Sequence, residues 1–254
     1  MERTIRPRLR SLTPLGTRNA PTNHLLGRDR VAGNLESEVS RMIRATPGKC
    51  LGRVELRNHH NHSGENIHRL AALLEQTRII PSVRAPEFVL RSVRAPGNVV
   101  YFLFGNPEHI AEMVEVVTAA GKVPMVNVDL ASGLSRDEAA ISFLAHRQVQ
   151  GIISTHIEPL RAAREFGLFA IKRTFLLDSA ALESGLHSLE QFLPDALEVM
   201  PAIVAPRILP KLRQRYPELP VIGGGMITTL REIEDLVQQG IDSVSVSDSQ
   251  LWIA

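Results

Sequence analysis

Short β-branched segments alternate with longer segments of helical periodicity over most of this 254-residue chain. Strands are predicted at Ile79–Val83, Val99–Phe104, Val123–Val128, Gly151–Ser154, Leu168–Arg173, Ala196–Met200, Val221–Gly223 and Ser243–Ser247. Helices are predicted between them, near Pro86–Val93, Pro107–Ala120, Arg136–His146, Glu158–Phe166, Ser179–Leu189, Ile203–Arg215 and Thr228–Gln239. Eight strands and seven helices, at spacings of about 20 to 25 residues on average, predict an α/β fold of the (β/α)8 TIM-barrel type rather than an open doubly wound sheet.

The ends of this pattern define the predicted domain as residues 66–254. A helix is expected before the first strand, because Ile67, Leu70, Ala71 and Leu74 share one helical face. The sequence ends soon after the eighth strand, so the last helix of the barrel is expected to be truncated. Leu251–Trp252 would then close the bottom of the barrel or pack on the first helix in its place.

Residues 1–65 form a predicted extension that is basic and largely disordered, with a short helix near Leu35–Arg44. Residues 1–70 carry 13 Lys and Arg against 6 Asp and Glu, a balance of +7, and residues 71–254 carry 16 against 21, a balance of −5. Three histidines close together in this extension, at positions 59, 60 and 62, are interpreted as part of a solvated loop rather than a metal site, and no metal site is predicted.

The cellular compartment is inferred from the cysteine content and from the lack of targeting segments. A single cysteine, Cys50, cannot form an internal disulfide and indicates a reducing compartment. No apolar run approaches the roughly 20 residues that span a bilayer, so no membrane contact is expected. A cytoplasmic location is predicted, and a transit peptide is the competing interpretation of the Arg-rich start.

Polar side chains are expected to converge at the carboxyl ends of the strands, where barrel proteins carry their binding and active sites. Alternate strand residues face the helices and the interior, and the helix-facing residues must be apolar. With the valines and leucines of strands three, six and eight facing the helices, the polar residues between them point inward: Asn127, Asp129, Glu198, Ser243, Ser245 and Ser247. A purely structural polar network is the alternative interpretation.

The three consecutive glycines after the seventh strand suggest a phosphate site. Gly223, Gly224 and Gly225 would allow backbone N–H groups to approach a ligand without interference from a Cβ atom. Barrels commonly bind phosphate at the loops after strands seven and eight. We therefore predict a phosphate site formed by these glycines with Ser245 and Ser247.

Further candidates follow strands four and five. Ser154, Thr155 and His156 end strand four, and His156 is interpreted as a helix-start or surface histidine because no carboxylate is adjacent in the sequence. Lys172 could form a Schiff base if buried near a carboxylate, or be a surface amine. Arg173 could bind a phosphate or pair with Asp129 or Glu198.

Several motifs, in order from the third strand onward, resemble the glycerol-3-phosphate-responsive antiterminator family. They are Val128-Asp129-Leu130 with Gly133-Leu134, Gly151-Ile152-Ile153-Ser154-Thr155, Arg173 with Phe175-Leu176-Leu177-Asp178, Pro194-Asp195 with Glu198-Val199, and Gly224-Gly225 with Leu251-Trp252. The resemblance covers about residue 70 to the C-terminus. Relative to the family pattern, Asn127 stands in place of His and Lys172 in place of Gln.

The resemblance implies a cytoplasmic regulator without a cofactor. Such a protein would bind glycerol 3-phosphate and then the leader mRNA of a glycerol-metabolism operon, and it could be a homodimer. By the resemblance, Gly224, Gly225, Ser245 and Ser247 would hold the phosphate. A second group would lie near the glycerol moiety: Asn127, Asp129, Arg173 and Glu198. The alternative is an aldolase or isomerase that acts on a triose phosphate through Lys172.

Overall fold

The structure, a computed structural model, describes residues 63–253. The helices are α2 (Ser63–Glu75), α3 (Val89–Arg94), α4 (Pro107–Ala119), α5 (Glu138–His146), α6 (Ile157–Glu165), α7 (Ser179–Gln191), α8 (Ala205–Arg215) and α9 (Leu230–Gln238), with 3-10 turns η1 (Pro86–Phe88), η2 (Ala202–Val204) and η3 (Ser249–Leu251). The strands are β1 (Ile79–Val83), β2 (Val99–Phe102), β3 (Val123–Asn127), β4 (Gly151–Ser154), β5 (Phe169–Phe175), β6 (Ala196–Met200), β7 (Val221–Gly224) and β8 (Ser243–Val246).

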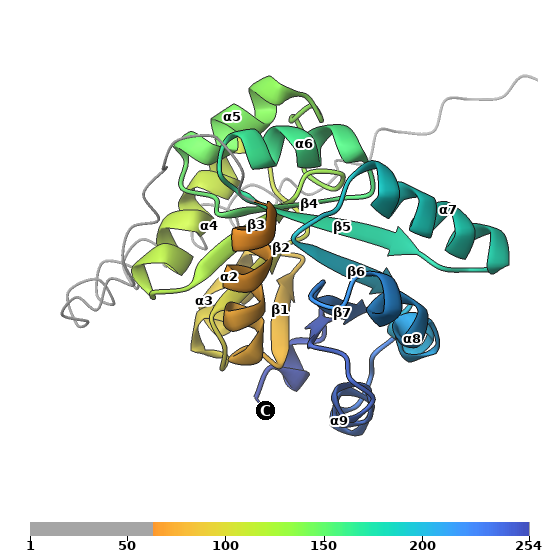
Figure 1. The fold of residues 1–254 in the computed structure, drawn as a ribbon. Helices are drawn as coiled ribbons and strands as arrows, with labels where there is room; N and C mark the ends of the chain where they lie inside the picture. Colours follow the sequence, from red (N-terminus) through yellow and green to blue (C-terminus); the bar gives the residue numbers. More distant parts are fainter. Residues whose placement is uncertain (1–62, 254) are drawn as a thin grey trace, which may run out of the picture.

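The eight strands pair in parallel and in sequence order, and β8 pairs with β1 to close the barrel (Figure 1). The predicted TIM-type barrel is confirmed. Apart from its last three residues, the predicted extension 1–65 lies outside the described residues, as do the predicted helix 35–44, Cys50 and the histidines at 59, 60 and 62.

Two hydrophobic cores occupy the two faces of the closed sheet. Val126, Val199 and Val244 belong to the larger core, which lies between the strands and the surrounding helices. Tyr101 and Met125 belong to the smaller core inside the barrel. The predicted strand alternation is therefore correct for β3, β6 and β8.

Helix α2 covers the N-terminal end of the barrel. Its Leu70 and Leu74 are buried in the interior core. Ser243, at the start of β8, faces inward as predicted and donates a hydrogen bond to the carbonyl oxygen of Thr77, 2.6 Å away. In Figure 1 this helix crosses in front of the strands. The opposite, C-terminal end is where the loops that follow the strands gather.

The segment after β8 packs on η1, which lies within the helix predicted near Pro86–Val93. Of the two predicted outcomes, it therefore packs on the first inter-strand helix. Trp252 is buried, and its indole Nε1 donates to the carbonyl oxygen of Val246 at 2.8 Å. Its ring meets Phe88 of η1 edge-on, with centroids 6.4 Å apart. Trp252 thus joins the end of β8 to η1.

Some element boundaries differ from the prediction for local reasons. Helix α5 begins at Glu138 rather than Arg136, because the Asp137 side chain accepts a hydrogen bond from the Ala140 amide and acts as N-cap. Strand β8 ends at Val246, so Ser247 lies beyond it.

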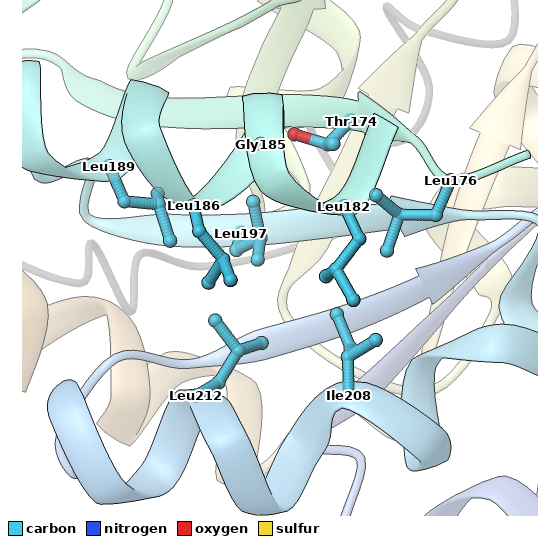
Figure 2. A pocket seen from close by; sticks show the side chains of 9 residues that line it. All are labelled: Thr174, Leu176, Leu182, Gly185, Leu186, Leu189, Leu197, Ile208 and Leu212. Atoms are coloured by element: carbon cyan, nitrogen blue, oxygen red, sulfur yellow. The ribbon is translucent and has the colours of Figure 1, made fainter. Parts of the chain in front are cut away.

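An apolar pocket lies between helix α7, strands β5 and β6, and helix α8. Leucines of α7 face Ile208 and Leu212 of α8 across it, as Figure 2 shows. The polar atom at its edge, Thr174 Oγ1, is buried and has no hydrogen-bond partner among the described residues. The pocket lies on the helix side of the sheet and contains none of the predicted site residues.

A buried carboxyl group lies at the start of β6, near the N-terminal end of the barrel. Asp195 is fully buried; its Oδ2 accepts from the Ala170 amide at 2.8 Å, and Arg164 Nη2 lies 3.7 Å from its Oδ1. Burial raises the pKa of Asp195 to about 6, and the amide hydrogen bond and the Arg164 charge offset only part of this effect.

We expect the Asp195→Asn substitution to raise the free energy of unfolding, relative to the parent protein, by more at neutral pH than at pH 4. The folded chain binds the Asp195 proton more tightly than the unfolded chain, so ionisation lowers the free energy of unfolding as the pH rises from about 4 to about 6. The Asn variant escapes this loss. Its free energy of unfolding, relative to the parent, should increase by roughly 3 kcal/mol between pH 4 and pH 7 in denaturant titrations. Asp235→Asn, at an exposed position of α9, is the control. A difference that is constant with pH would contradict this assignment.

Candidate functional site

A buried carboxylate joins four neighbouring strands at the C-terminal end of the barrel interior. Glu198 of β6 has an exposed fraction of 0%. Its Oε2 accepts from Arg173 Nε of β5 at 2.6 Å, and its Oε1 accepts from Ser245 Oγ of β8, also at 2.6 Å. Gly224 of β7 lies against Glu198 Oε1 and Ser245 Oγ. We call Arg173, Glu198, Gly224 and Ser245 the Glu198 cluster. Of the two carboxylates predicted as partners of Arg173, Asp129 and Glu198, the structure pairs Arg173 with Glu198.

A different contact or backbone angle explains each of the three glycines of the predicted phosphate loop. A Cβ on Gly224 would lie 2.6 Å from Ser245 Oγ and 3.0 Å from Glu198 Oε1. A Cβ on Gly223 would point to the helix side, 3.2 Å from the Cβ of Ala202. Gly225 has φ +77°, in the left-handed region that favours glycine. Of the three, Gly224 is the one whose Cα approaches the Glu198 cluster.

The predicted phosphate residue Ser247 is not in this cluster. It is exposed and follows the last residue of β8, so the strand alternation from which its inward direction was predicted no longer applies. Ser245, one strand repeat earlier, is buried and inward as predicted.

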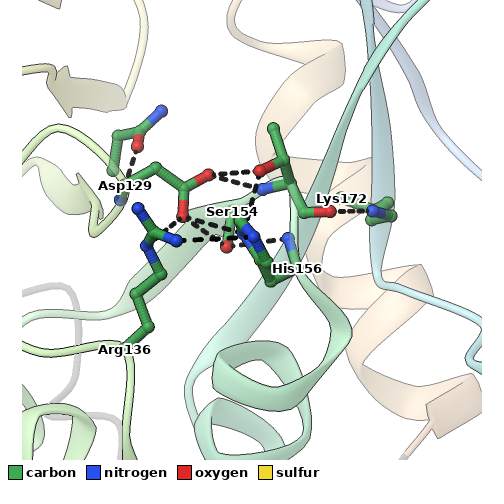
Figure 3. Close-up of polar contacts among 7 residues, drawn as sticks. Asp129, Arg136, Ser154, His156 and Lys172 are labelled. Carbon is green, nitrogen blue, oxygen red and sulfur yellow. Dashed lines mark hydrogen bonds and ion pairs between the residues drawn. The ribbon is translucent and has the colours of Figure 1, made fainter.

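Asp129 is the centre of a second polar cluster. Its carboxylate accepts from Ser154 Oγ at 2.8 Å, from the Thr155 amide at 2.6 Å and from Thr155 Oγ1 at 2.8 Å. Arg136 Nε and His156 Nδ1 lie 3.4 and 3.5 Å from its Oδ1. Figure 3 shows these side chains converging on Asp129. Asp129 therefore links the loop after β3 to the end of β4.

We call this group the Asp129 cluster, and its contacts differ from those predicted. Arg173 was predicted to pair with Asp129 as one alternative, but Asp129 instead contacts Ser154, Thr155, Arg136 and His156. Strand β3 ends at Asn127, so Asp129 lies in the loop that follows it. Asn127 is buried, and its Oδ1 accepts from the Asp129 amide at 3.0 Å. His156 is the N-cap residue of α6 and its side chain is 48% exposed, as predicted for a helix-start or surface histidine. It also has a carboxylate neighbour, Asp129, 27 positions away in the sequence.

The electrostatics of the Asp129 cluster favour an ionised carboxylate. Burial alone would raise the pKa of Asp129, but hydrogen bonds from Thr155 and Ser154 and the nearby His156 outweigh it, and the pKa lies below its ordinary value. The donors that surround this carboxylate are those that would otherwise be available to an external anion.

Lys172 lies on the helix-facing side of β5, between the inward-facing residues Ile171 and Arg173. Its Nζ donates to the carbonyl oxygen of Thr155. Burial lowers the pKa of Lys172, and the charges of Asp129 and Glu158 partly oppose this effect. Such an amine could act as a nucleophile only on a substrate outside the barrel interior. The geometry gives no support to a Schiff base at the mouth of the barrel.

Sequence reasoning missed two residues near these clusters. Tyr101 of β2 is completely buried in the interior core, and its hydroxyl has no hydrogen-bond partner among residues 63–253. Burial, then the charge of Glu198, raise the pKa of Tyr101 well above its ordinary value, and the charge of Arg173 opposes them. Strand alternation along Val99–Phe102 would have predicted its inward direction. Arg136 carries no such signal, because it lies in an irregular loop.

Two groups of basic residues lie on the outer helices α6 and α8, and most of their charged groups are engaged in contacts within the protein. Arg161 and Arg164 of α6 donate to carbonyl oxygens and stack on Phe192. Arg213 and Arg215 of α8 form ion pairs with Asp242 and Glu190. These contacts favour the interpretation of both groups as solvated, structural charges.

Within residues 63–253, no group of three or more His, Cys, Asp and Glu side chains is arranged to hold a metal ion. Among the same residues, no helix is long and apolar enough to cross a membrane.

Comparison with known proteins places this geometry in a family context. The model of the family described as "Glycerol-3-phosphate responsive antiterminator" matches residues 79–252, which spans all eight strands. An uncharacterized protein of Escherichia coli, YgcP, is 29% identical over 184 residues, which are 72% of this chain and 95% of that protein.

Solved structures agree with this match. A glycerol uptake operon antiterminator regulatory protein from Listeria monocytogenes is 28% identical, with a TM-score of 0.63 over 68% of this chain and 94% of that one. A glycerol uptake operon antiterminator-related protein from Thermotoga maritima is 27% identical, with the same TM-score over 70% and 98%. An aldolase, QR15, is 13% identical with a TM-score of 0.54, a similarity of fold alone.

We expect Asp129→Asn to destabilise the protein at neutral pH by about 1–3 kcal/mol. The amide keeps one strong acceptor and directs an NH2 group at donors that now bind a carboxylate. Because the pKa of Asp129 is lowered in the folded state, the effect should shrink as the pH falls below 3.8, through the folded-state pKa. Denaturant unfolding of the variant, with Asp235→Asn as the exposed control, measures this. Equal stability of the two variants would mean that the Asp129 cluster does not stabilise the contact between the loop after β3 and the end of β4.

Proposed function

The chain belongs to the glycerol-3-phosphate responsive antiterminator family, and from this premise we propose that it binds glycerol 3-phosphate and, when liganded, the leader mRNA of a glycerol-metabolism operon. The ligand site is proposed at the C-terminal end of the barrel. Gly224, Gly225 and Ser245 would face the phosphate, and Arg173 and Glu198 the glycerol end.

The observation that carries this proposal is the Glu198 cluster. It brings a buried arginine, a hydroxyl and a closely packed glycine together at the carboxyl ends of β5 to β8. This is the end at which barrels bind phosphate esters. Arg173 offers a guanidinium and Ser245 a hydroxyl, which are donors suited to a phosphate or a polyol.

Exposed apolar side chains at the same end support a macromolecular contact there. Seven large apolar residues are exposed within the described chain, and six of them end a strand or follow one at this end. They are Leu130, Phe175, Leu177, Ile203, Met226 and Leu230. Exposed apolar side chains at one end of a fold are suited to contact with a partner, and unpaired RNA bases stack on aromatic rings such as Phe175. We propose that the leader RNA docks on these residues. A homodimer that uses the same end is the competing use of this surface.

A regulator is proposed in preference to a triose-phosphate aldolase or isomerase. The family is that of antiterminators, and Lys172 faces the helices rather than the mouth of the barrel. Borohydride treatment with a triose phosphate should therefore leave Lys172 unmodified. Trapping of an adduct at Lys172 would favour the enzyme.

Glycerol 3-phosphate should raise the melting temperature of the full chain. At about 100 times the dissociation constant the folded state gains roughly 2.7 kcal/mol. Glycerol and dihydroxyacetone phosphate should give smaller shifts at equal concentration. Ser245→Ala should reduce the shift, because it removes the hydroxyl donor, whereas Ser142→Ala on α5 should not. A ligand shift that is equal in the two variants would remove Ser245 from the site.

Binding of the operon's own leader RNA should require the ligand. Gel-shift titrations over a salt series, with and without glycerol 3-phosphate, measure this and separate the electrostatic part. Phe175→Ala should weaken RNA binding by about 1–3 kcal/mol, the range for loss of one stacked base. Ile253→Ala, an exposed apolar residue outside this surface, is the control. Equal losses in both variants would place the RNA elsewhere.

A further inference from the structure

The donors of the Glu198 cluster are already occupied by a carboxylate of the protein. Arg173 Nε and Ser245 Oγ each donate to Glu198 at 2.6 Å, and all three residues are buried. An anion that used these two donors would have to replace Glu198 as their acceptor.

The position of Gly224 makes coexistence of the two anions unfavourable. A Cβ atom at position 224 would lie 3.0 Å from Glu198 Oε1 and 2.6 Å from Ser245 Oγ, so little space is left between these groups. A phosphate bound to Ser245 would therefore meet the Glu198 carboxylate at close range, where two like charges repel strongly in a protein interior. One of them must move.

The Tyr101 hydroxyl, inside the barrel, is the candidate second partner for Glu198. The Tyr101 hydroxyl is buried in the barrel and has no hydrogen-bond partner among the described residues, although Glu198 and Arg173 are both within electrostatic reach of it. A buried hydroxyl without a partner costs free energy. A Glu198 carboxylate that turned away from Ser245 would satisfy that hydroxyl.

We propose that Glu198 is the internal competitor of the anionic ligand: it binds Arg173 and Ser245 in the ligand-free state, and when a phosphate group takes its place at Ser245 it turns toward Tyr101. This inference rests on the proposed function, because it concerns the same site. It makes Glu198 and Tyr101 residues that set the affinity for the anion, and it couples phosphate binding to a rearrangement between β2 and β6.

Glu198→Gln tests the competition. The amide can still accept from Arg173 or Ser245 but carries no charge to repel the ligand. Its affinities for inorganic phosphate and glycerol 3-phosphate, measured calorimetrically on the full chain, should rise on the order of tenfold. Its affinity for uncharged glycerol should not rise. Glu115→Gln, an exposed position of α4, is the matched control and should behave as the parent. An equal or lower affinity of Glu198→Gln for both anions overturns the proposal.

Folding of this variant is itself informative. Removing one partner of a buried ion pair leaves Arg173 without a counter-charge, which is strongly destabilising. If Glu198→Gln is unfolded alone, added phosphate should restore its cooperative melting transition by taking the vacated position. Failure of phosphate at any concentration to restore it, while the parent binds phosphate, overturns the proposal.

Tyr101→Phe tests the second partner of Glu198 without threatening the fold. The variant loses a hydroxyl that has no partner in this structure, so its melting temperature should be equal to that of the parent or higher. Its affinity for glycerol 3-phosphate should nevertheless fall several-fold, and that of Tyr216→Phe should not. A purely structural Tyr101 would leave the affinity unchanged, and this result would overturn the proposal. If the parent chain binds none of these anions, the proposed function itself fails. Binding by the parent without the variant effects removes this inference alone.

Discussion

The buried ion pair between Glu198 and Arg173, with Ser245 as a second donor, is the interaction on which the C-terminal end of this barrel depends. Backbone pairing closes the sheet, but it does not determine which side chains meet inside it. One carboxylate joins β5 to β8 and packs under β7 so closely that only glycine fits at position 224. A buried charge without its partners would be costly, so these strands are held in one mutual arrangement.

The polar residues at this end divide into two carboxylate-centred clusters with different roles. The Glu198 cluster lies inside the barrel, and the Asp129 cluster links the ends of β3 and β4 around the rim. In each, a protein carboxylate accepts from donors that could bind an anion. The Asp129 carboxylate completes a loop contact, whereas the Glu198 carboxylate occupies the position where the fold and family lead us to propose a ligand.

Sequence reasoning anticipated the fold more fully than the site. Strand alternation correctly directed Glu198 and Ser245 inward, because their neighbours in the strand are apolar and must face the helices. The same argument failed for Ser247 and Asp129, because both lie beyond the last strand residue, where alternation no longer holds. The glycine run was correctly located, but Gly223 and Gly224 are explained by contacts with Ala202 and with Glu198 and Ser245.

The sequence by itself determined the eight-fold alternation, the closed parallel barrel and the family, because periodicity and motif order are local properties of the chain. Only the tertiary structure decided which polar groups pair. Arg173 pairs with Glu198 rather than Asp129, and His156 has a carboxylate neighbour 27 residues away. Among residues 63–253, the Tyr101 hydroxyl has no hydrogen-bond partner. These pairings depend on the strand register and on where each strand ends. Shifts of a few Ångström in backbone position change both, and no short sequence motif encodes them.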